Sequence, residues 1–214
     1  MTMSTSSRTL KSALAYVGGL GSPSKMPCYS YGISASRCNT GGKLQKVEGS
    51  VCSDCYACKG MYQFSVVKEA HERRYESLFQ PHWAENMAFI INRKKMTYFR
   101  WHDSGDLQGM QHLLNIVKVA DETPNCQHWL PTKELSLINR YLDTFGEFPA
   151  NLIVRVSAPI IDAKPVGGVT HTSTVHRNDS PFGQVCPAPT QGGKCESCRA
   201  CWDKGVPNVS YHHH

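Results

Sequence analysis

Apolar residues in the middle of the chain follow two alternating patterns. Helical spacing, with charged residues on the other face where it is amphipathic, recurs in four segments: 64–78, 83–91, 110–120 and 135–145. Short β-rich runs occur in three others, each ending in polar or turn-forming residues: 96–101, 126–130 and 152–156. Strands that alternate with helices over short links are typical of parallel βαβ units.

Several residues mark where these elements begin and end. Pro81 suits the first turn of the second helix, Thr132 can cap the helix over 135–145, and Gly146 is placed to stop it. Arg73 and Arg74 are interpreted as part of a solvated helix face. The same holds for the basic run at 93–95, because no aromatic residues interleave with these cations as a nucleic-acid stacking platform requires.

The predicted fold is α/β, with parallel strands in a small or incomplete (β/α) barrel and cysteine-rich loops at both ends. The 214 residues fit one domain, although a full eight-fold barrel would be cramped. Within this single domain, 1–214, we expect five segments: an N-terminal arm (1–27), a cysteine-rich metal loop (28–60), an α/β core (61–180), a C-terminal cysteine-rich metal segment (181–205) and a tail (206–214). The closing histidines of the tail are either native or the remnant of a tag.

Three cysteines, Cys52, Cys55 and Cys58, follow one another at intervals of three residues. Such neighbours do not readily pair as disulfides, but a loop or helical turn directs all of them toward one side. Their spacing fits the way bacterial ferredoxins hold iron–sulfur clusters. The fourth ligand is open between Cys28 and Cys38. Cys38 is favoured because it lies nearer, in a turn-rich loop that a metal would help to order.

A second run with the same spacing lies near the far end, together with a separate Cys-Pro at Cys186. A C-x2-C-x2-C run accompanied by Cys-Pro is again a ferredoxin-like pattern. We therefore predict iron–sulfur cofactors of the 4Fe–4S type, one or two per chain. The candidate ligands of the two sites are Cys38, Cys52, Cys55, Cys58, Cys186, Cys195, Cys198 and Cys201.

Three other interpretations of the cysteines remain open. Zinc also takes four thiolates, although its C-x2-C pairs usually lie on separate knuckles. One shared cluster could draw thiolates from both ends of the chain, and thiol–disulfide exchange by one Cys-x2-Cys pair would leave the other cysteines unexplained. Cys126 begins a predicted strand and is interpreted as a small core residue rather than a ligand.

Polar residues gather where the predicted strands end. In barrels and open α/β sheets, the carboxyl ends of parallel strands form the functional face. We therefore expect a polar rim that supplies acid–base groups and binds a small polar or anionic substrate. Ser104 to Asp106 could instead be only a helix-capping turn. The candidate catalytic residues of this rim are His102, Asp103, Asp106, Lys133 and Arg155.

Charge and cysteine content narrow the class of protein. The chain has 23 basic and 17 acidic residues, an excess that thiolate–metal centres could balance, so a nucleic-acid partner is not implied. The apolar run at 13–17 is too short for a secretory or membrane-spanning segment. Ten cysteines without a secretory signal predict a cytosolic protein with reduced, metal-bound thiols. No membrane partner is expected.

Four motifs together resemble an uncharacterised bacteriophage family named after "gene product eighty-eight". They are VCSDCYA at 51–57, KGMY at 59–62, FRWHDSGDL at 99–107 and WLPTKE at 129–134, and the match extends from about residue 25 to 202. The resemblance implies a phage origin and hence the cytoplasm of the infected bacterial host.

The resemblance also extends, more loosely, to phage proteins whose Cys-x2-Cys-Tyr-Ala motif looks like that of radical S-adenosylmethionine (SAM) enzymes. That kinship implies a cluster with one iron open to SAM. The residues themselves do not support SAM, because those enzymes carry C-x3-C-x2-C and a glycine-rich segment after the first strand.

The predicted function is that of a phage iron–sulfur protein with a redox, electron-transfer or cluster-dependent catalytic role. Its expected partners are an electron donor or a small polar substrate. The alternative is a zinc-stabilised module that contacts host nucleic acid or a host protein.

Overall fold

The computed structural model describes residues 8–177 and 181–213. In this part of the chain, seven strands form one sheet in which all neighbours are parallel. From edge to edge the strands are β1 (Tyr29–Tyr31), β2 (Tyr98–Trp101), β3 (Gln127–Thr132), β4 (Leu152–Ser157), β5 (Thr172–His176), β7 (Asn208–His212) and β6 (Gln184–Val185).

The helices and strands predicted for the middle of the chain are confirmed, within a few residues at each end. The described helices are α1 (Leu10–Tyr16), α2 (Thr40–Leu44), α3 (Ser65–Ser77), α4 (Trp83–Arg93), α5 (Met110–Asp121) and α6 (Leu135–Phe145). Gly146 ends α6 with a φ of 82°, a left-handed conformation that glycine adopts without strain. The α/β class of the fold therefore follows the pattern of apolar residues.

The sheet does not close into the predicted barrel. Closure requires the two edge strands to pair, and β1 and β6 show no such pairing among the described residues. The edge strands are also short, with three residues in β1 and two in β6. The βαβ pattern stops after β4, because the described residues between the later strands include no α-helix. The result is an open parallel sheet.

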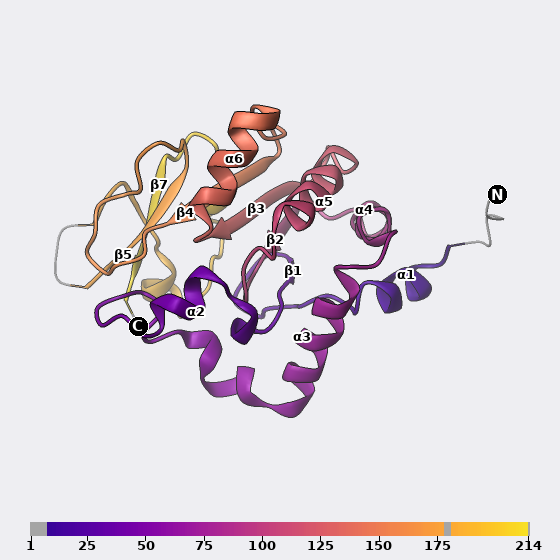
Figure 1. The fold of residues 1–214 in the computed structure, drawn as a ribbon, viewed down its shortest axis with the longest axis horizontal. Helices are drawn as coiled ribbons and strands as arrows, with labels where there is room; N and C mark the ends of the chain where they lie inside the picture. The colour runs from indigo at the N-terminus through magenta and orange to yellow at the C-terminus, as the bar shows by residue number, and fades with distance from the viewer. Residues whose placement is uncertain (1–7, 178–180, 214) are drawn as a thin grey trace.

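The two faces of the sheet are covered differently (Figure 1). Along β2, Phe99 and Trp101 are buried in the core that the helices share, and α5 and α6 lie along this face. Tyr98 and Trp129 point to the other face, where both rings contact Trp202 of the C-terminal segment. Trp202 Nε1 also donates to Phe99 O at 2.9 Å. A cysteine-rich segment thus takes the place of a second helical layer.

Two regions differ from what the sequence pattern suggests. The apolar run at 13–17 belongs largely to α1, which begins with a capping box between Thr9 and Ser12 and packs on α4. Arg74 is only 7% exposed, not solvated as expected. Its guanidinium donates to the carbonyl oxygens of Gly19 and Gly32, each at 3.3 Å, and so ties α3 to the chain before and after β1.

Candidate metal centres

Four cysteines come together near the start of α2, and we name Cys38, Cys52, Cys55 and Cys58 the N-terminal cysteine group. Burial raises the pKa of the Cys38 thiol to about 12, and nearby Asp106 and the other three thiols act in the same direction. Gln45 Nε2 donates to Cys58 Sγ at 3.4 Å. The structure therefore groups Cys38 with the C-x2-C-x2-C run, and metal binding by these four remains a prediction.

Helix α2 approaches this group through a residue without a side chain. A Cβ on Gly41 would lie 3.1 Å from the Cβ of Cys38, and 3.5 Å and 3.6 Å from the sulfurs of Cys52 and Cys38. The same addition at Gly42 meets nothing within 4 Å. Gly41 thus leaves open a space that adjoins two candidate ligands, and the soft thiol donors around it suit iron–sulfur or zinc. Sequence reasoning did not single out this glycine.

The N-terminal cysteine group is attached to the carboxyl-terminal edge of the sheet. Val51 N donates to Pro159 O at 2.9 Å, just beyond the end of β4. The Glu134 carboxylate, just beyond β3, accepts hydrogen bonds from Thr40 N at 2.8 Å and from Thr40 Oγ1 at 2.9 Å. A negative charge at the first turn of α2 is favourable. The N-terminal cysteine group therefore lies at the carboxyl-terminal edge of the sheet, next to the ends of β3 and β4.

Asp106 is bound from three sides by its own chain. One carboxylate oxygen accepts from Thr132 Oγ1 at 2.6 Å and from Leu107 N at 2.7 Å, and the other accepts from Lys133 N at 2.8 Å. Burial raises the pKa of Asp106, while these hydrogen bonds oppose the shift. Asp106 therefore links the ends of β2 and β3 by hydrogen bonds. This role resembles the helix-capping turn that the sequence analysis kept as an alternative.

Lys133 points toward the cysteines. Its Nζ donates to Ala158 O at 3.1 Å, and it forms no ion pair within 4 Å of a carboxylate in the described ranges. Burial lowers the pKa of Lys133, and the nearby Cys52, Asp106 and Cys55 oppose that shift. A half-buried cation thus lies beside the N-terminal cysteine group.

His102, a candidate catalytic residue, is buried rather than exposed on an open rim, and Asp103 next to it is half-buried. His102 is 4% exposed with a φ of 53°, and neither ring nitrogen has a hydrogen-bond partner among the described residues. Burial lowers the pKa of His102 to about 4, so its ring is neutral near pH 7. The ring faces His112 of α5 at 5.4 Å. The Asp103 carboxylate occupies the space where a Cβ on Gly32 would lie.

Arg155 does not share the rim, and this part of the prediction is wrong. Arg155 has no exposed surface and points to the face of the sheet that the C-terminal segment covers. It donates to five backbone carbonyls, so the guanidinium is used to hold η5 (Ala200–Trp202) and the start of β7. The acceptors, at 2.8–3.3 Å, are those of Thr172, Ala200, Cys201, Asp203 and Pro207. Because side chains alternate along a strand, Arg155 falls on the side opposite Val154 and Val156.

A second set of thiols lies on that covered face, and we name Cys28, Cys186, Cys195 and Cys198 the C-terminal cysteine group. Burial raises the pKa of Cys195, and nearby Cys186 and Cys198 raise it further. Cys28, which sequence reasoning considered only for the other site, lies near Cys195. Cys195 N also donates to Lys25 O at 3.0 Å, which brings the two segments together.

Cys201, the remaining member of the predicted C-terminal set, is held differently. Its sulfur lies 3.1 Å from the Tyr211 hydroxyl of β7. Burial raises the pKa of Cys201 to about 12, and nearby Cys186 adds to the increase. The hydrogen bond with Tyr211 and the positive charges of Arg100 and Arg155 oppose it. Cys201 thus borders the C-terminal cysteine group, and the structure offers either Cys28 or Cys201 beside the other three. Cys126 is confirmed as a buried core residue.

Arg100 lies between the two cysteine groups, and sequence reasoning did not name it as a candidate although it belongs to the FRWHDSGDL motif. Its guanidinium stacks on Trp129 at 4.6 Å, and one terminal nitrogen lies 3.3 Å from the Tyr56 hydroxyl. Tyr56 comes from the N-terminal run and donates to Asp103 O at 2.6 Å. On its other side Arg100 lowers the pKa of Cys28, Cys195 and Cys201, although burial raises each of them more.

The described residues contain no set of three Cys, His, Asp or Glu side chains arranged to hold a single metal ion. No helix within the described ranges is long and apolar enough to cross a membrane.

Comparison with known proteins identifies the family. No curated protein and no solved structure matches the chain. The family described as Gene product 88 matches residues 2–204, which is most of the sequence and includes every cysteine. The chain therefore belongs to the Gene product 88 family of phage proteins.

Proposed function

We propose that this phage protein is an iron–sulfur protein that stores or passes electrons, with one cluster in each cysteine group. The ligands would be Cys38, Cys52, Cys55 and Cys58 in the first group. The second would use Cys186, Cys195 and Cys198 with either Cys28 or Cys201. The observation that carries the proposal is that two separate sets of thiols each lie beside a half-buried cation.

The charges around the thiols support this proposal. Lys133 lies beside the N-terminal cysteine group and Arg100 beside the C-terminal one. Neither cation pairs with a carboxylate within 4 Å in the part of the chain that the structure describes. A buried cation is costly unless a counter-charge lies near it. Thiolates bound to metal would supply that charge on both sides.

The donor atoms and the space between them also fit the group. Thiolates hold a cluster around a body of several atoms, so they stand farther apart than the ligands of one ion. The missing side chain of Gly41 keeps two of the sulfurs accessible to such a body. When bound, a cluster would supply one-electron chemistry, while the chain itself would shield it and balance its charge.

Electron transfer is favoured over catalysis at the rim. Asp106 is saturated by donors of its own chain, His102 is buried, and Arg155 lies on the other face. The contact between Tyr56 and Arg100 instead joins the two cysteine groups, since Tyr56 follows Cys55 directly. The expected partner is an electron donor in the cytoplasm of the infected bacterium, where thiols stay reduced.

The experiment is to purify the protein without oxygen and measure iron, acid-labile sulfide and zinc. We expect brown protein with broad visible absorbance, and iron and sulfide in roughly equal amounts. Colourless protein with stoichiometric zinc would overturn the proposal and favour the zinc-stabilised binding module.

A further inference from the structure

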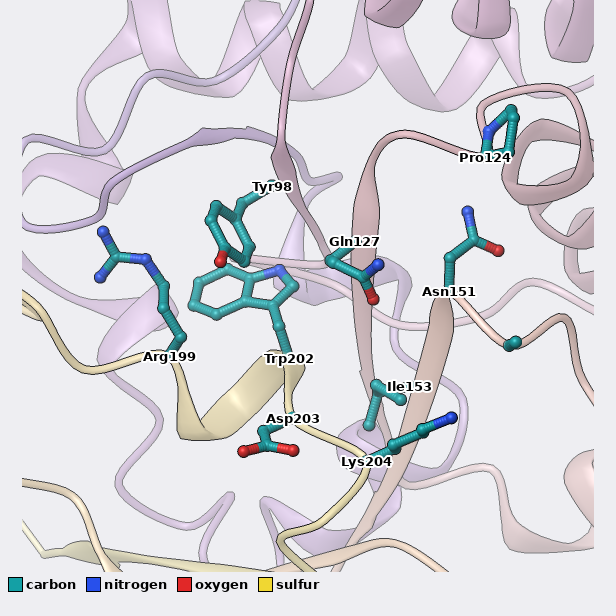
Figure 2. Close-up of a pocket in the computed structure, with 10 residues that line it drawn as sticks. Tyr98, Pro124, Gln127, Asn151, Ile153, Arg199, Trp202, Asp203 and Lys204 are labelled. Atoms are coloured by element: carbon teal, nitrogen blue, oxygen red, sulfur yellow. The ribbon is translucent and has the colours of Figure 1, made fainter.

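A hollow of about 500 Å³ opens at the amino-terminal edge of the sheet, away from the N-terminal cysteine group (Figure 2). Tyr98 and Gln127 begin β2 and β3, and Asn151 directly precedes β4. The C-terminal segment forms the opposite wall with Arg199, Trp202 and Lys204. This volume lies in the range of small-molecule sites. No residue of the predicted rim lines it.

The hollow combines aromatic walls with two cations. The rings of Tyr98 and Trp202 meet edge to face at 5.5 Å, and the guanidinium of Arg199 lies 5.2 Å from the Tyr98 ring. Figure 2 shows Arg199 and Lys204 on opposite sides of Asp203. Among the described residues, neither cation has a carboxylate within 4 Å, and Asp203 is occupied with the backbone N–H of Gly205 at 2.7 Å. Arg199 Nη1 donates to the backbone carbonyls of Glu196 and Cys198. The other N–H groups of Arg199 and the Lys204 ammonium are available to an anionic group.

Two side-chain amides supply polar recognition. Asn151 Nδ2 donates to three backbone carbonyls at 2.9–3.1 Å, those of Ala120, Thr123 and Cys126, which fixes the orientation of its amide. Its Oδ1 is left as an acceptor. The Gln127 amide makes no hydrogen bond to any described residue. A fixed acceptor and an unused amide beside aromatic walls suit the edge of a heterocyclic base.

We propose that this hollow binds a nucleoside monophosphate. The phosphate contacts the Lys204 ammonium, and the N–H groups of Arg199 that bind no backbone carbonyl add a second positive charge at the rim of the hollow. The base packs against Tyr98 and meets the amide of Gln127. A triphosphate is a poorer match, because the lining residues include no glycine from a phosphate-binding loop and only two cations. The proposal does not depend on which metal the cysteines hold.

The test is calorimetric titration of the full chain, purified without oxygen, with AMP, GMP, CMP and UMP. At least one should bind, and the matching nucleoside and inorganic phosphate should each bind about tenfold more weakly, or about 1.4 kcal/mol. Equal binding by phosphate alone would overturn the proposal. So would the absence of heat with all four nucleotides at millimolar concentration.

Variants locate the site. Lys204→Ala and Gln127→Ala should each weaken binding about fivefold or more. Lys204 is exposed, so its removal does not threaten the fold. The matched control is Lys164→Ala, an exposed lysine of the β4–β5 connection, which should leave affinity unchanged. Unchanged affinity in Lys204→Ala and Gln127→Ala, or an equal loss in Lys164→Ala, would place the ligand elsewhere and contradict the proposal.

Discussion

The two cysteine groups share a sequence motif but differ in how the chain holds them. Cys52, Cys55 and Cys58 lie in a loop at the edge of the sheet, followed by exposed apolar side chains such as Met61 and Phe64. The C-terminal run lies flat on a sheet face, where a buried guanidinium and an indole fasten η5 to the strands. The first group is tied to the sheet edge at single points, and the second is fastened across a sheet face while its own cysteines stay half-buried.

The two cysteine runs also differ in which further cysteine lies beside them. Cys38 joins the first run from the loop just before α2. In the second run, Cys201 is engaged by Tyr211, and Cys28 joins from the position directly before β1. A repeated motif therefore does not imply a repeated structure. Tertiary contacts decide which cysteine accompanies each run.

The largest expected effect on stability follows from removing the Arg155 side chain, which holds the C-terminal segment on the sheet. Arg155→Met leaves five buried or partly buried carbonyls without their donor, and we expect a loss of about 3–5 kcal/mol in the free energy of unfolding. Chemical denaturation followed by circular dichroism measures it. Cleavage within 186–206 by a protease should become faster, while the N-terminal group keeps its metal.

The control is Arg140→Met on the exposed face of α6, which should cost less than about 0.5 kcal/mol. A variant Arg155→Met as stable as this control would mean that the C-terminal segment is held by something other than the guanidinium.

Removing the metal should affect the two cysteine groups to different degrees, because the chain holds them differently. After chelation, proteolysis should cut 45–64 first, because only single hydrogen bonds such as those of Val51 and Tyr56 tie this loop to the sheet, and it depends on its ligands for further order. The C-terminal segment should be cut more slowly, since Arg155 and Trp202 still hold it. Mass spectrometry of the fragments over time measures the order. Equal rates at both segments would show that the difference in anchorage has no consequence.

A pair of glycine variants tests the space beside the N-terminal group. Gly41→Ala places a methyl 3.1 Å from Cys38 Cβ and in contact with the Cys52 sulfur, so Cys38 must shift slightly and the metal content of this group should fall. Gly42→Ala meets nothing within 4 Å and should instead stabilise the protein by about 0.5–1 kcal/mol, as alanine does in a helix. Metal content and thermal unfolding of both variants measure the contrast. Similar metal content in both variants would show that the space beside Gly41 is not needed for metal binding.

The smallest effect concerns charge. Lys133→Met removes the cation beside Cys52 and should make the N-terminal centre harder to reduce, by about 1 kcal/mol or roughly 40 mV for one electron. The C-terminal centre should not change. Redox titration followed by electron paramagnetic resonance measures both. A shift of the two centres together, or of neither, would indicate that Lys133 does not face the N-terminal group.

Much of the fold can be predicted from the sequence because its signals are local. The apolar periodicity of α5 and α6 and the stop at Gly146 are properties of neighbouring residues. The short strand β1 and the later strands β5 to β7 carry little periodicity, since they are defined by the strands beside them. The open sheet follows from these strands, so the predicted barrel could not be corrected from local patterns.

In the candidate site, too, the local features can be predicted from the sequence and the long-range ones cannot. The cysteine spacings identify the thiols, but which of them gather is set by contacts far apart in the chain, such as Cys195 with Lys25. The direction of Arg155 depends on the alternation of β4 relative to a segment 45 residues away. Gly41 lies in no quoted motif, and Arg100 lies in FRWHDSGDL without being singled out there; both are identified only by their neighbours in space.

The central claim is that each cysteine group holds its own iron–sulfur cluster. It is tested most directly by iron and sulfide analysis of Cys52→Ser, Cys198→Ser and the double variant, with the core variant Cys126→Ser as control. The account predicts that each single variant keeps about half of the iron and sulfide. It also predicts that the double variant keeps almost none and that Cys126→Ser keeps all. Complete loss in either single variant, or zinc in place of iron, would contradict it.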